Sequence, residues 1–203
     1  HSYNRLVLAN GSHPFVPPIP GVGRENIISM RTDSDAATAL AAARAGKACV
    51  VVGGGLLGLE TAAALAGQGA KITVVEYADY LLPRQLTPTA AAILKDNFEK
   101  QNIIVLNGEQ VKEFVGDHRV YGVQTADHGI LPAELVVICA GVRPNRFLPS
   151  KAGLEVNRGV LVDDYLQTSD KDIFAAGDIA EHDGTIYGLW TISQEQGRIA
   201  GAN

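Results

Sequence analysis

Apolar and polar positions divide most of the chain into alternating strands and helices. Short runs rich in β-branched and aliphatic residues predict strands over residues 5–9, 49–52, 71–76 and 103–106. Helices are predicted over residues 34–45, 56–66 and 90–100, with Asp33 or Ser34 capping the first and Thr87 or Thr89 capping the third. Strands that alternate with helices in this way are typical of an α/β fold with a parallel sheet.

The pattern changes after residue 106. Residues 111–115, residues 120–125 and a short piece near Ile130 are apolar runs parted by turn residues, which predicts an antiparallel meander. Residues 135–140 then form a further buried strand. Near the end of the chain, strands are expected over 159–163 and 173–176, followed by a helix that begins at Thr191 or Ser193.

Two breaks suggest how the domains are arranged. Residues 17–21, Pro-Pro-Ile-Pro-Gly, predict an extended connector, because proline fixes φ and removes a donor. Residues 141–145 form the second break. We therefore expect a dinucleotide-binding domain over residues 22–140, inserted between residues 1–21 and 141–203 of a second, discontinuous domain. The chain starts at His1 without an initiating Met, so we also expect a piece of a longer protein.

Composition narrows the partners. The chain has 203 residues, 46% of them hydrophobic, and a formal net charge of −5 without any basic run, so nucleic acid and anionic membranes are not expected partners. Its two cysteines, Cys49 and Cys139, lie in predicted buried strands and are expected to be small buried hydrophobes. The five histidines show no ligand spacing, so no metal site is expected. This cysteine usage fits a reducing cytoplasm.

A glycine motif carries the clearest chemical signal. Gly53, Gly55 and Gly58 follow the strand 49–52 at G-x-G-x-x-G spacing and open the helix that starts at Leu56. The first glycine permits a tight turn, the second lets a pyrophosphate approach the backbone, and the third lets the helix pack closely on the sheet. The free N–H groups and partial positive charge at the helix N-terminus suit phosphates.

Glu76 completes this motif. It ends the next strand, 23 residues after Gly53 (76 − 53), close to the usual separation of about 20 residues for the acid that binds the adenosine ribose. A carboxylate there would repel a 2′-phosphate, so NADH is favoured over NADPH. Arg84 lies shortly after and keeps this preference moderate.

Four motifs together resemble the FAD-dependent pyridine nucleotide-disulfide oxidoreductases of the glutathione-reductase structural type. They are residues 3–21 (YNRLVLANGSHPFVPPIPG), the glycine motif with Glu76, residues 138–145 (ICAGVRPN) and residues 168–180 (TSDKDIFAAGDIA). The segment 188–203 is most similar to single-chain reductases, such as NADH oxidases, rubredoxin reductase and the flavoprotein part of NADH-dependent nitrite reductase. The sequence does not decide between the resemblance to rubredoxin reductase and the resemblance to the flavoprotein part of nitrite reductase.

The resemblance implies further site residues. Glu60, Ala140 and Gly141 are implied to lie near the nicotinamide. A flavin would be held by Asp178 after Gly177, with Asp178 accepting a ribityl hydroxyl. The family's Ala-Thr-Gly turn is Ala9-Asn10-Gly11 here. Trp190 is implied to lie near the flavin ring, and a plain core aromatic is the equal alternative.

The implied fold is a Rossmann-like NAD-binding domain, with a parallel sheet and an antiparallel β-meander, inserted into an incomplete FAD-binding domain. The implied activity is hydride transfer from NADH to FAD, followed by electron transfer to an acceptor protein or domain such as a nitrite-reducing centre or rubredoxin. No protein nucleophile or base is expected, since the cofactors carry the chemistry. The alternative is an NADH-binding module without turnover, because the family's first flavin-binding glycine motif does not occur in these residues. A homodimer stays open.

Overall fold

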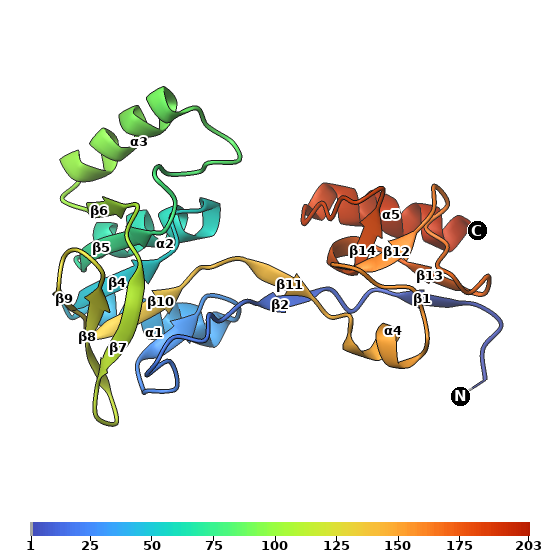
Figure 1. The fold of residues 1–203 in the computed structure, drawn as a ribbon, viewed down its shortest axis with the longest axis horizontal. Coiled ribbons are helices and arrows are strands. Elements are labelled where there is room, and N and C mark those ends of the chain that lie inside the picture. Colours follow the sequence, from blue (N-terminus) through green and yellow to red (C-terminus); the bar gives the residue numbers. More distant parts are fainter. Residues whose placement is uncertain (1) are drawn as a thin grey trace. The chain divides into compact units, whose positions relative to one another are not determined.

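The computed structural model describes residues 2–203, which form two compact units. One unit contains the described residues up to His13 together with Val142–Asn203, and the other is the continuous segment Pro14–Gly141. Most elements of both are labelled in Figure 1. An inserted unit between two segments of another was expected from the sequence, although the first boundary differs from the expected one by eight residues (21 − 13).

The continuous unit, Pro14–Gly141, is built on a five-stranded parallel sheet. Its strand order is β3-β10-β4-β5-β6, and every neighbouring pair is parallel. The strands are β3 (Ile27–Ser29), β4 (Ala48–Val52), β5 (Lys71–Glu76), β6 (Ile104–Asn107) and β10 (Leu135–Ile138). The sequence pattern identified four of them, whereas β3 has only three half-buried residues and gave no detectable run.

Three helices cover one face of this sheet: α1 (Asp33–Arg44), α2 (Leu56–Gly67) and α3 (Pro88–Lys100). The cap of α3 is Thr87, one of the two expected residues, with Pro88 in its first turn. The expected cap of α1 was wrong. Thr32 caps this helix, because Thr32 and Asp35 form a reciprocal capping box that satisfies two N–H groups at once.

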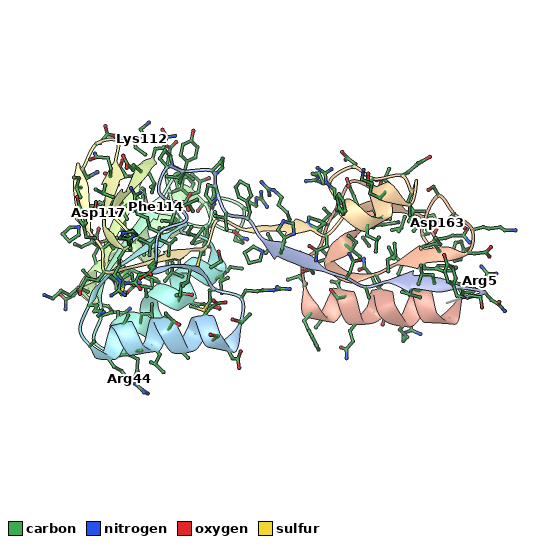
Figure 2. The ribbon with its side chains drawn as sticks, turned by 90° about the horizontal axis from the view of Figure 1, so that it is seen from below. Arg5, Arg44, Lys112, Phe114, Asp117 and Asp163 are labelled. Atoms are coloured by element: carbon green, nitrogen blue, oxygen red, sulfur yellow. The ribbon has the colours of Figure 1, made fainter. Side chains whose placement is uncertain are left out.

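The antiparallel meander that the sequence predicts covers the other face, a position that the sequence did not indicate. It contains β7 (Val111–Gly116), β8 (Val120–Thr125) and β9 (Ile130–Pro132), paired in the order β7-β8-β9. Phe114, labelled in Figure 2, is fully buried between this meander and strand residues such as Val50 and Val136. A purely parallel sheet needs cover on both faces, and helices and meander supply it.

The proline-rich segment belongs to the continuous unit and is not a separate connector. Ile19 packs on the core beneath the meander, and the carbonyl of Pro20 accepts a hydrogen bond of 2.9 Å from the N–H of Phe114. The N–H of Phe15 also donates to the carbonyl of Gly141 over 2.8 Å. The proline pattern correctly predicted extended backbone, but these contacts were not readable from local sequence.

The discontinuous unit contains short paired strands. Strand β1 (Leu6–Leu8) pairs in parallel with β13 (Ile173–Ala175), and β12 (Val160–Val162) pairs in parallel with β14 (Ala180–His182). Strand β2 (Ser12–Pro14), which reaches one residue into the continuous unit, pairs with β11 (Val142–Pro144). The remaining elements are helices α4 (Phe147–Lys151) and α5 (Trp190–Ala202) and the 3₁₀ turn η1 (Gly177–Ile179).

A buried acid stabilises this discontinuous unit. The carboxylate of Glu181 on β14 is almost fully buried and accepts hydrogen bonds from the N–H of Gly159 over 2.8 Å and from the amide of Asn157 over 2.9 Å. Burial raises the pKa of Glu181, but these hydrogen bonds and the nearby Arg158 outweigh burial and hold that pKa below its ordinary value. The acid therefore stays ionised and fixes the turn before β12.

Across residues 2–203, no helix combines the length and the apolar character that crossing a membrane would require. The same residues hold no cluster of three or more His, Cys, Asp or Glu side chains arranged for a metal ion. Cys49 and Cys139 are free thiols; Cys49 is buried, as the sequence predicts, whereas Cys139 follows the end of β10 and is only half-buried. Burial raises the pKa of each thiol to about 11, so both are poor nucleophiles near neutral pH.

Candidate functional site

The turn from β4 into α2 requires glycine at two of the three motif positions. Gly53 has φ +115°, and a Cβ there would lie 2.4 Å from the carbonyl oxygen of Cys139. A Cβ on Gly58 would lie 2.0 Å from the carbonyl oxygen of Gly53. Both distances are far below contact, so the strand, turn and helix can approach this closely only without side chains. The structure thus gives Gly53 and Gly58 the packing roles that the motif predicts.

Gly55 differs from the other two. A Cβ built on Gly55 would meet no atom of the described residues within 4 Å. Its φ and ψ, −80° and 179°, are ordinary extended values, so neither packing nor backbone conformation demands glycine here. The space in front of Gly55 is open, as an approaching ligand would require.

The N-terminus of α2 borders that open space. Gly55 is the N-cap, and no side chain of residues 2–203 caps the helix there. The N–H groups in the first turn, beginning at the exposed Leu56, have no partner within the helix. Unpartnered N–H groups beside an open, glycine-lined space fit the phosphates of a dinucleotide.

The side chain of Glu76 forms a hydrogen bond to the β4–α2 turn. Its Oε2 accepts a hydrogen bond of 2.5 Å from the N–H of Gly54, and its Oε1 accepts one of 2.7 Å from the N–H of Ala78. These two bonds orient the carboxylate beside the glycine turn, 22 residues away in sequence (76 − 54). Each oxygen keeps a further lone pair, which is what two ribose hydroxyl donors would need.

A second acid, Glu109, which the sequence analysis missed, forms hydrogen bonds near the strand end that carries Glu76. Glu109 lies in the corner between β6 and β7, and its side chain is only 1% exposed. The carboxylate accepts hydrogen bonds from the N–H groups of Ala126 (2.7 Å) and Asp127 (3.1 Å) and contacts Nδ1 of His128. Its own N–H donates to the carbonyl of Glu76 over 2.9 Å. Glu109 thus links the β8–β9 turn to the strand end that carries Glu76, a relation that no sequence spacing reveals.

The other residues expected near the nicotinamide also lie in the continuous unit. Ala140 and Gly141 follow β10 after Cys139, and Gly141 has φ +89°, so this turn favours glycine. Glu60 is an exposed residue of α2, and no hydrogen bond or ion pair of its side chain occurs within residues 2–203. The thiol of Cys139 next to Ala140 contacts the side chain of Thr61 and is not aligned with another reactive group.

The discontinuous unit holds the remaining predicted residues. Gly11 has φ +62° and its Cβ position is open, whereas Ala9 and Asn10 are exposed. The side-chain amide of Asn10 donates to the carbonyl of Asn145 over 2.9 Å, and the Asn145 amide donates back to the carbonyl of Asn10 over 2.6 Å. The side-chain amide of Asn10 therefore stabilises the turn at residues 9–11, and its N–H donors are less available for a ligand.

Asp178 is held by residues that the sequence analysis did not single out. Ser12 is buried, and its hydroxyl donates to Oδ2 of Asp178 over 2.7 Å. The N–H of Gly177 donates to the buried side chain of Gln196 over 2.8 Å. The described residues give Oδ1 of Asp178 no hydrogen bond, so this oxygen is the one left to accept from a ligand hydroxyl. Neither Ser12 nor Gln196 belongs to a spacing pattern that would have revealed it.

The predicted residues thus fall into one group in each unit. The first group surrounds a single turn of the continuous unit and contains Gly53, Gly55, Leu56, Gly58 and Glu76. The second group belongs to short turns of the discontinuous unit and contains Gly11, Gly177 and Asp178. Trp190 is 82% exposed as the first residue of α5, so the alternative of a core aromatic is wrong. The first group has the donors, open space and acid that fit a nicotinamide dinucleotide. The second offers a few oriented acceptors for a flavin.

Comparison with known proteins gives a consistent result. The family model described as pyridine nucleotide-disulphide oxidoreductase matches residues 1–197. Nitrite reductase [NAD(P)H] of Bacillus subtilis is 43% identical over 97% of this chain and 24% of its own length. The solved NAD-dependent persulfide reductase of A. fulgidus has a TM-score of 0.93 at 31% identity, over 99% of this chain and 39% of that one.

A further solved structure, the NADH:rubredoxin oxidoreductase of Clostridium acetobutylicum, has a TM-score of 0.79 at 30% identity and covers 98% of this chain and 49% of its own. The chain spans about a quarter of the nitrite reductase and less than half of each of these two structures. Its similarity therefore extends over nearly all of its own residues but over only part of each relative.

Proposed function

Because this chain belongs to the pyridine nucleotide-disulphide oxidoreductase family, we propose that it is the NADH-binding part of a flavoprotein oxidoreductase. The observation that carries the proposal is the β4–α2 turn. There, uncapped N–H groups, an open Gly55 and the oriented carboxylate of Glu76 surround one space. When bound, NADH supplies a hydride and FAD accepts it, so the chemistry belongs to the cofactors.

We assign the residue roles from the geometry of the β4–α2 turn and, for the nicotinamide and flavin ends, from the family resemblance. The N–H groups at the start of α2 bind the pyrophosphate, and Gly55 leaves room for it. Glu76 accepts the hydroxyls of the adenosine ribose. Ala140, Gly141 and Glu60 are assigned to the nicotinamide end. We assign Asp178, held by Ser12, to a ribityl hydroxyl of FAD, with Ala9, Asn10, Gly11 and Gly177 shaping the turns beside it.

The electron acceptor is proposed only by class. Nitrite reductase and NADH:rubredoxin oxidoreductase are among the similar proteins, so the acceptor is an electron-transfer protein or a redox domain of the same protein. The proposed partners are therefore the dinucleotide and such an acceptor, with cytoplasmic location and a homodimer kept as expectations from the sequence.

NADH binds more tightly than NADPH to the chain. The carboxylate of Glu76 is held toward the glycine turn by two N–H groups, and a 2′-phosphate beside it would meet like charge. Titration of the purified chain, followed by nicotinamide fluorescence, measures both affinities. Glu76→Gln removes the charge but keeps the shape, so it should narrow the difference. Equal affinity for the two cofactors in the wild type would contradict the role of Glu76.

The 203-residue chain produced by itself retains little or no FAD while still binding NADH. Asp178 and the turn at Gly11 offer a few hydrogen bonds, each worth about 0.5–1.5 kcal/mol net. Immobilising a large ligand costs at least about 4 kcal/mol, which these bonds offset poorly. The visible flavin absorbance of the purified chain, measured against its protein concentration, gives the retained FAD. Stoichiometric FAD would contradict this prediction.

NADH consumption with an artificial electron acceptor, measured with and without added FAD, distinguishes the second candidate function from the first. An NADH-binding module without turnover binds the dinucleotide but does not pass electrons to an artificial acceptor, with or without added FAD. The commitment of the Asn10 amide to Asn145 favours this candidate for the chain taken alone. NADH consumption that starts when FAD is added would instead support the flavoenzyme.

A further inference from the structure

The end of β5, which carries Glu76, is held by backbone hydrogen bonds beyond its strand pairing. The parallel ladder between β5 and β6 stops at the pair Glu76–Asn107. Past this pair, the N–H of Glu109 donates to the carbonyl of Glu76 over 2.9 Å. The N–H of Gly108 donates to the carbonyl of Ala78 over 2.8 Å. These two bonds therefore fix the backbone on both sides of the turn that begins after β5.

The same backbone orients the carboxylate that is proposed to bind the ribose. The N–H of Ala78 is one of the two donors to the Glu76 carboxylate, over 2.7 Å, and the N–H of Gly54 is the other, over 2.5 Å. Hydrogen bonds are directional, so a shift of the backbone at Ala78 would move its N–H and turn the carboxylate. The direction of the Glu76 carboxylate therefore depends on where Gly108 and Glu109 lie.

The side chain of Glu109 holds this backbone in place. Its carboxylate, whose side chain is only 1% exposed, accepts from the N–H groups of Ala126 and Asp127 over 2.7 and 3.1 Å and contacts the ring of His128. All three partners lie in the turn between β8 and β9. Several directional bonds leave a buried carboxylate a single position, whereas an apolar side chain could shift within its packing. Glu109 therefore links the β8–β9 turn to the end of β5 through fixed geometry.

We propose that Glu109 is a positioning residue for dinucleotide recognition, which holds the Glu76 carboxylate in the direction that distinguishes NADH from NADPH. This inference rests on the proposed function, since it needs the ribose to bind at Glu76. Glu109 acts through Glu76 and not on the ligand, because its own carboxylate is buried and occupied by the β8–β9 turn. The competing interpretation is a buried acid that stabilises the meander and has no influence on the ligand.

The test compares the preference for NADH with the stability of the fold. The purified chain and its variants are titrated with NADH, NADPH and reduced nicotinamide mononucleotide, and urea unfolding shows that each variant is folded during the titration. Glu109→Ala should weaken NADH binding about 10-fold, the lower end for losing one hydrogen bond to a charged group. NADPH and the mononucleotide, which lacks the adenosine ribose, should stay within about twofold, so the preference for NADH falls about 10-fold.

A double-mutant cycle shows whether Glu109 acts through Glu76. In Glu76→Gln the carboxylate is already gone, so adding Glu109→Ala should not lower the remaining preference for NADH any further. Glu109→Gln should keep most of the preference although the charge is lost, because its amide oxygen still accepts from the two N–H groups of the β8–β9 turn. A purely stabilising acid would show neither effect on the preference.

A second buried acid provides the matched control. The side chain of Glu181 in the discontinuous unit is also 1% exposed, and it accepts from the N–H of Gly159 over 2.8 Å and from the amide of Asn157 over 2.9 Å. Glu181→Ala leaves these buried donors without an acceptor, so it should destabilise the chain as Glu109→Ala does. It should leave the preference for NADH unchanged.

Each other outcome has a defined meaning. An unchanged preference in Glu109→Ala, an equal fall in Glu181→Ala or a further fall in the double variant would overturn the positioning role alone. If Glu109→Ala does not fold, Glu109→Asp decides by the same criteria, because it keeps the charge but is one methylene too short to reach the same donors. A wild type without any preference for NADH would overturn the assignment of Glu76, and this inference with it.

Discussion

We expect Gly55→Val to weaken NADH binding by at least about 100-fold and to leave the fold largely intact. The new side chain starts in the open space before α2, where its Cβ would meet no atom of the described residues within 4 Å, and the extended backbone of Gly55 suits a β-branched residue, so we expect the chain to fold. The same space is where the pyrophosphate must approach the N–H groups of the first helical turn. Losing two charge-assisted hydrogen bonds, each worth about 1.5–3 kcal/mol, weakens NADH binding by at least about 100-fold.

A matched glycine in the same turn provides the control. Gly58→Ala adds only one methyl group, yet its Cβ would lie 2.0 Å from the carbonyl oxygen of Gly53, so the backbone must shift. We expect this variant to lower the free energy of unfolding, whereas Gly55→Val does not. Fluorescence titration with NADH and urea unfolding followed by circular dichroism measure the two effects. Wild-type NADH affinity in Gly55→Val would show that the phosphates bind elsewhere.

The sequence predicted the α/β fold and the glycine turn because both depend on local spacing. A run of β-branched residues, three glycines and a terminal acid fix β4, α2 and β5 whatever their surroundings, and all three elements lie within about two residues of the expected bounds. The meander was predictable for the same reason, since its turn residues part three apolar runs.

What the sequence did not reveal depends on contacts between distant residues. Strand β3 is short and half-buried, and it becomes a strand only because β10 pairs with it. Ser12 contacts Asp178 across 166 residues of sequence, and Gln196 contacts Gly177 across 19, so no spacing rule links these pairs. For Trp190 the sequence left two alternatives, a position near the flavin ring and a position in the core, because a lone aromatic has no periodicity to place it.

Glu109→Ala destabilises the continuous unit strongly. The carboxylate is almost completely buried and accepts from two N–H groups of the β8–β9 turn as well as from His128. Alanine leaves these N–H donors without an acceptor, and each buried donor that loses its acceptor costs about 1–3 kcal/mol. Urea unfolding measures the loss, and hydrogen exchange at Ala126 and Asp127 should report it locally. Glu113→Ala on β7 is the matched control, since its exposed ion pair with Arg24 is worth about 0–1 kcal/mol.

The effect of Glu109 also depends on pH with a defined sign. Burial raises the pKa of the Glu109 carboxyl, but hydrogen bonds from His128, Asp127 and Ala126 outweigh burial and hold that pKa below its ordinary value of 4.5. A carboxyl whose pKa is lower in the folded state stabilises the fold above its unfolded pKa, and that stabilisation is lost as pH falls through the folded value.

Glu109→Gln imitates the protonated acid at every pH. The difference in unfolding free energy between wild type and Glu109→Gln should therefore be full near about pH 7 and shrink as pH drops below about 4. A difference that stays constant down to about pH 3 would show that the charge of Glu109 contributes nothing and that only its shape matters.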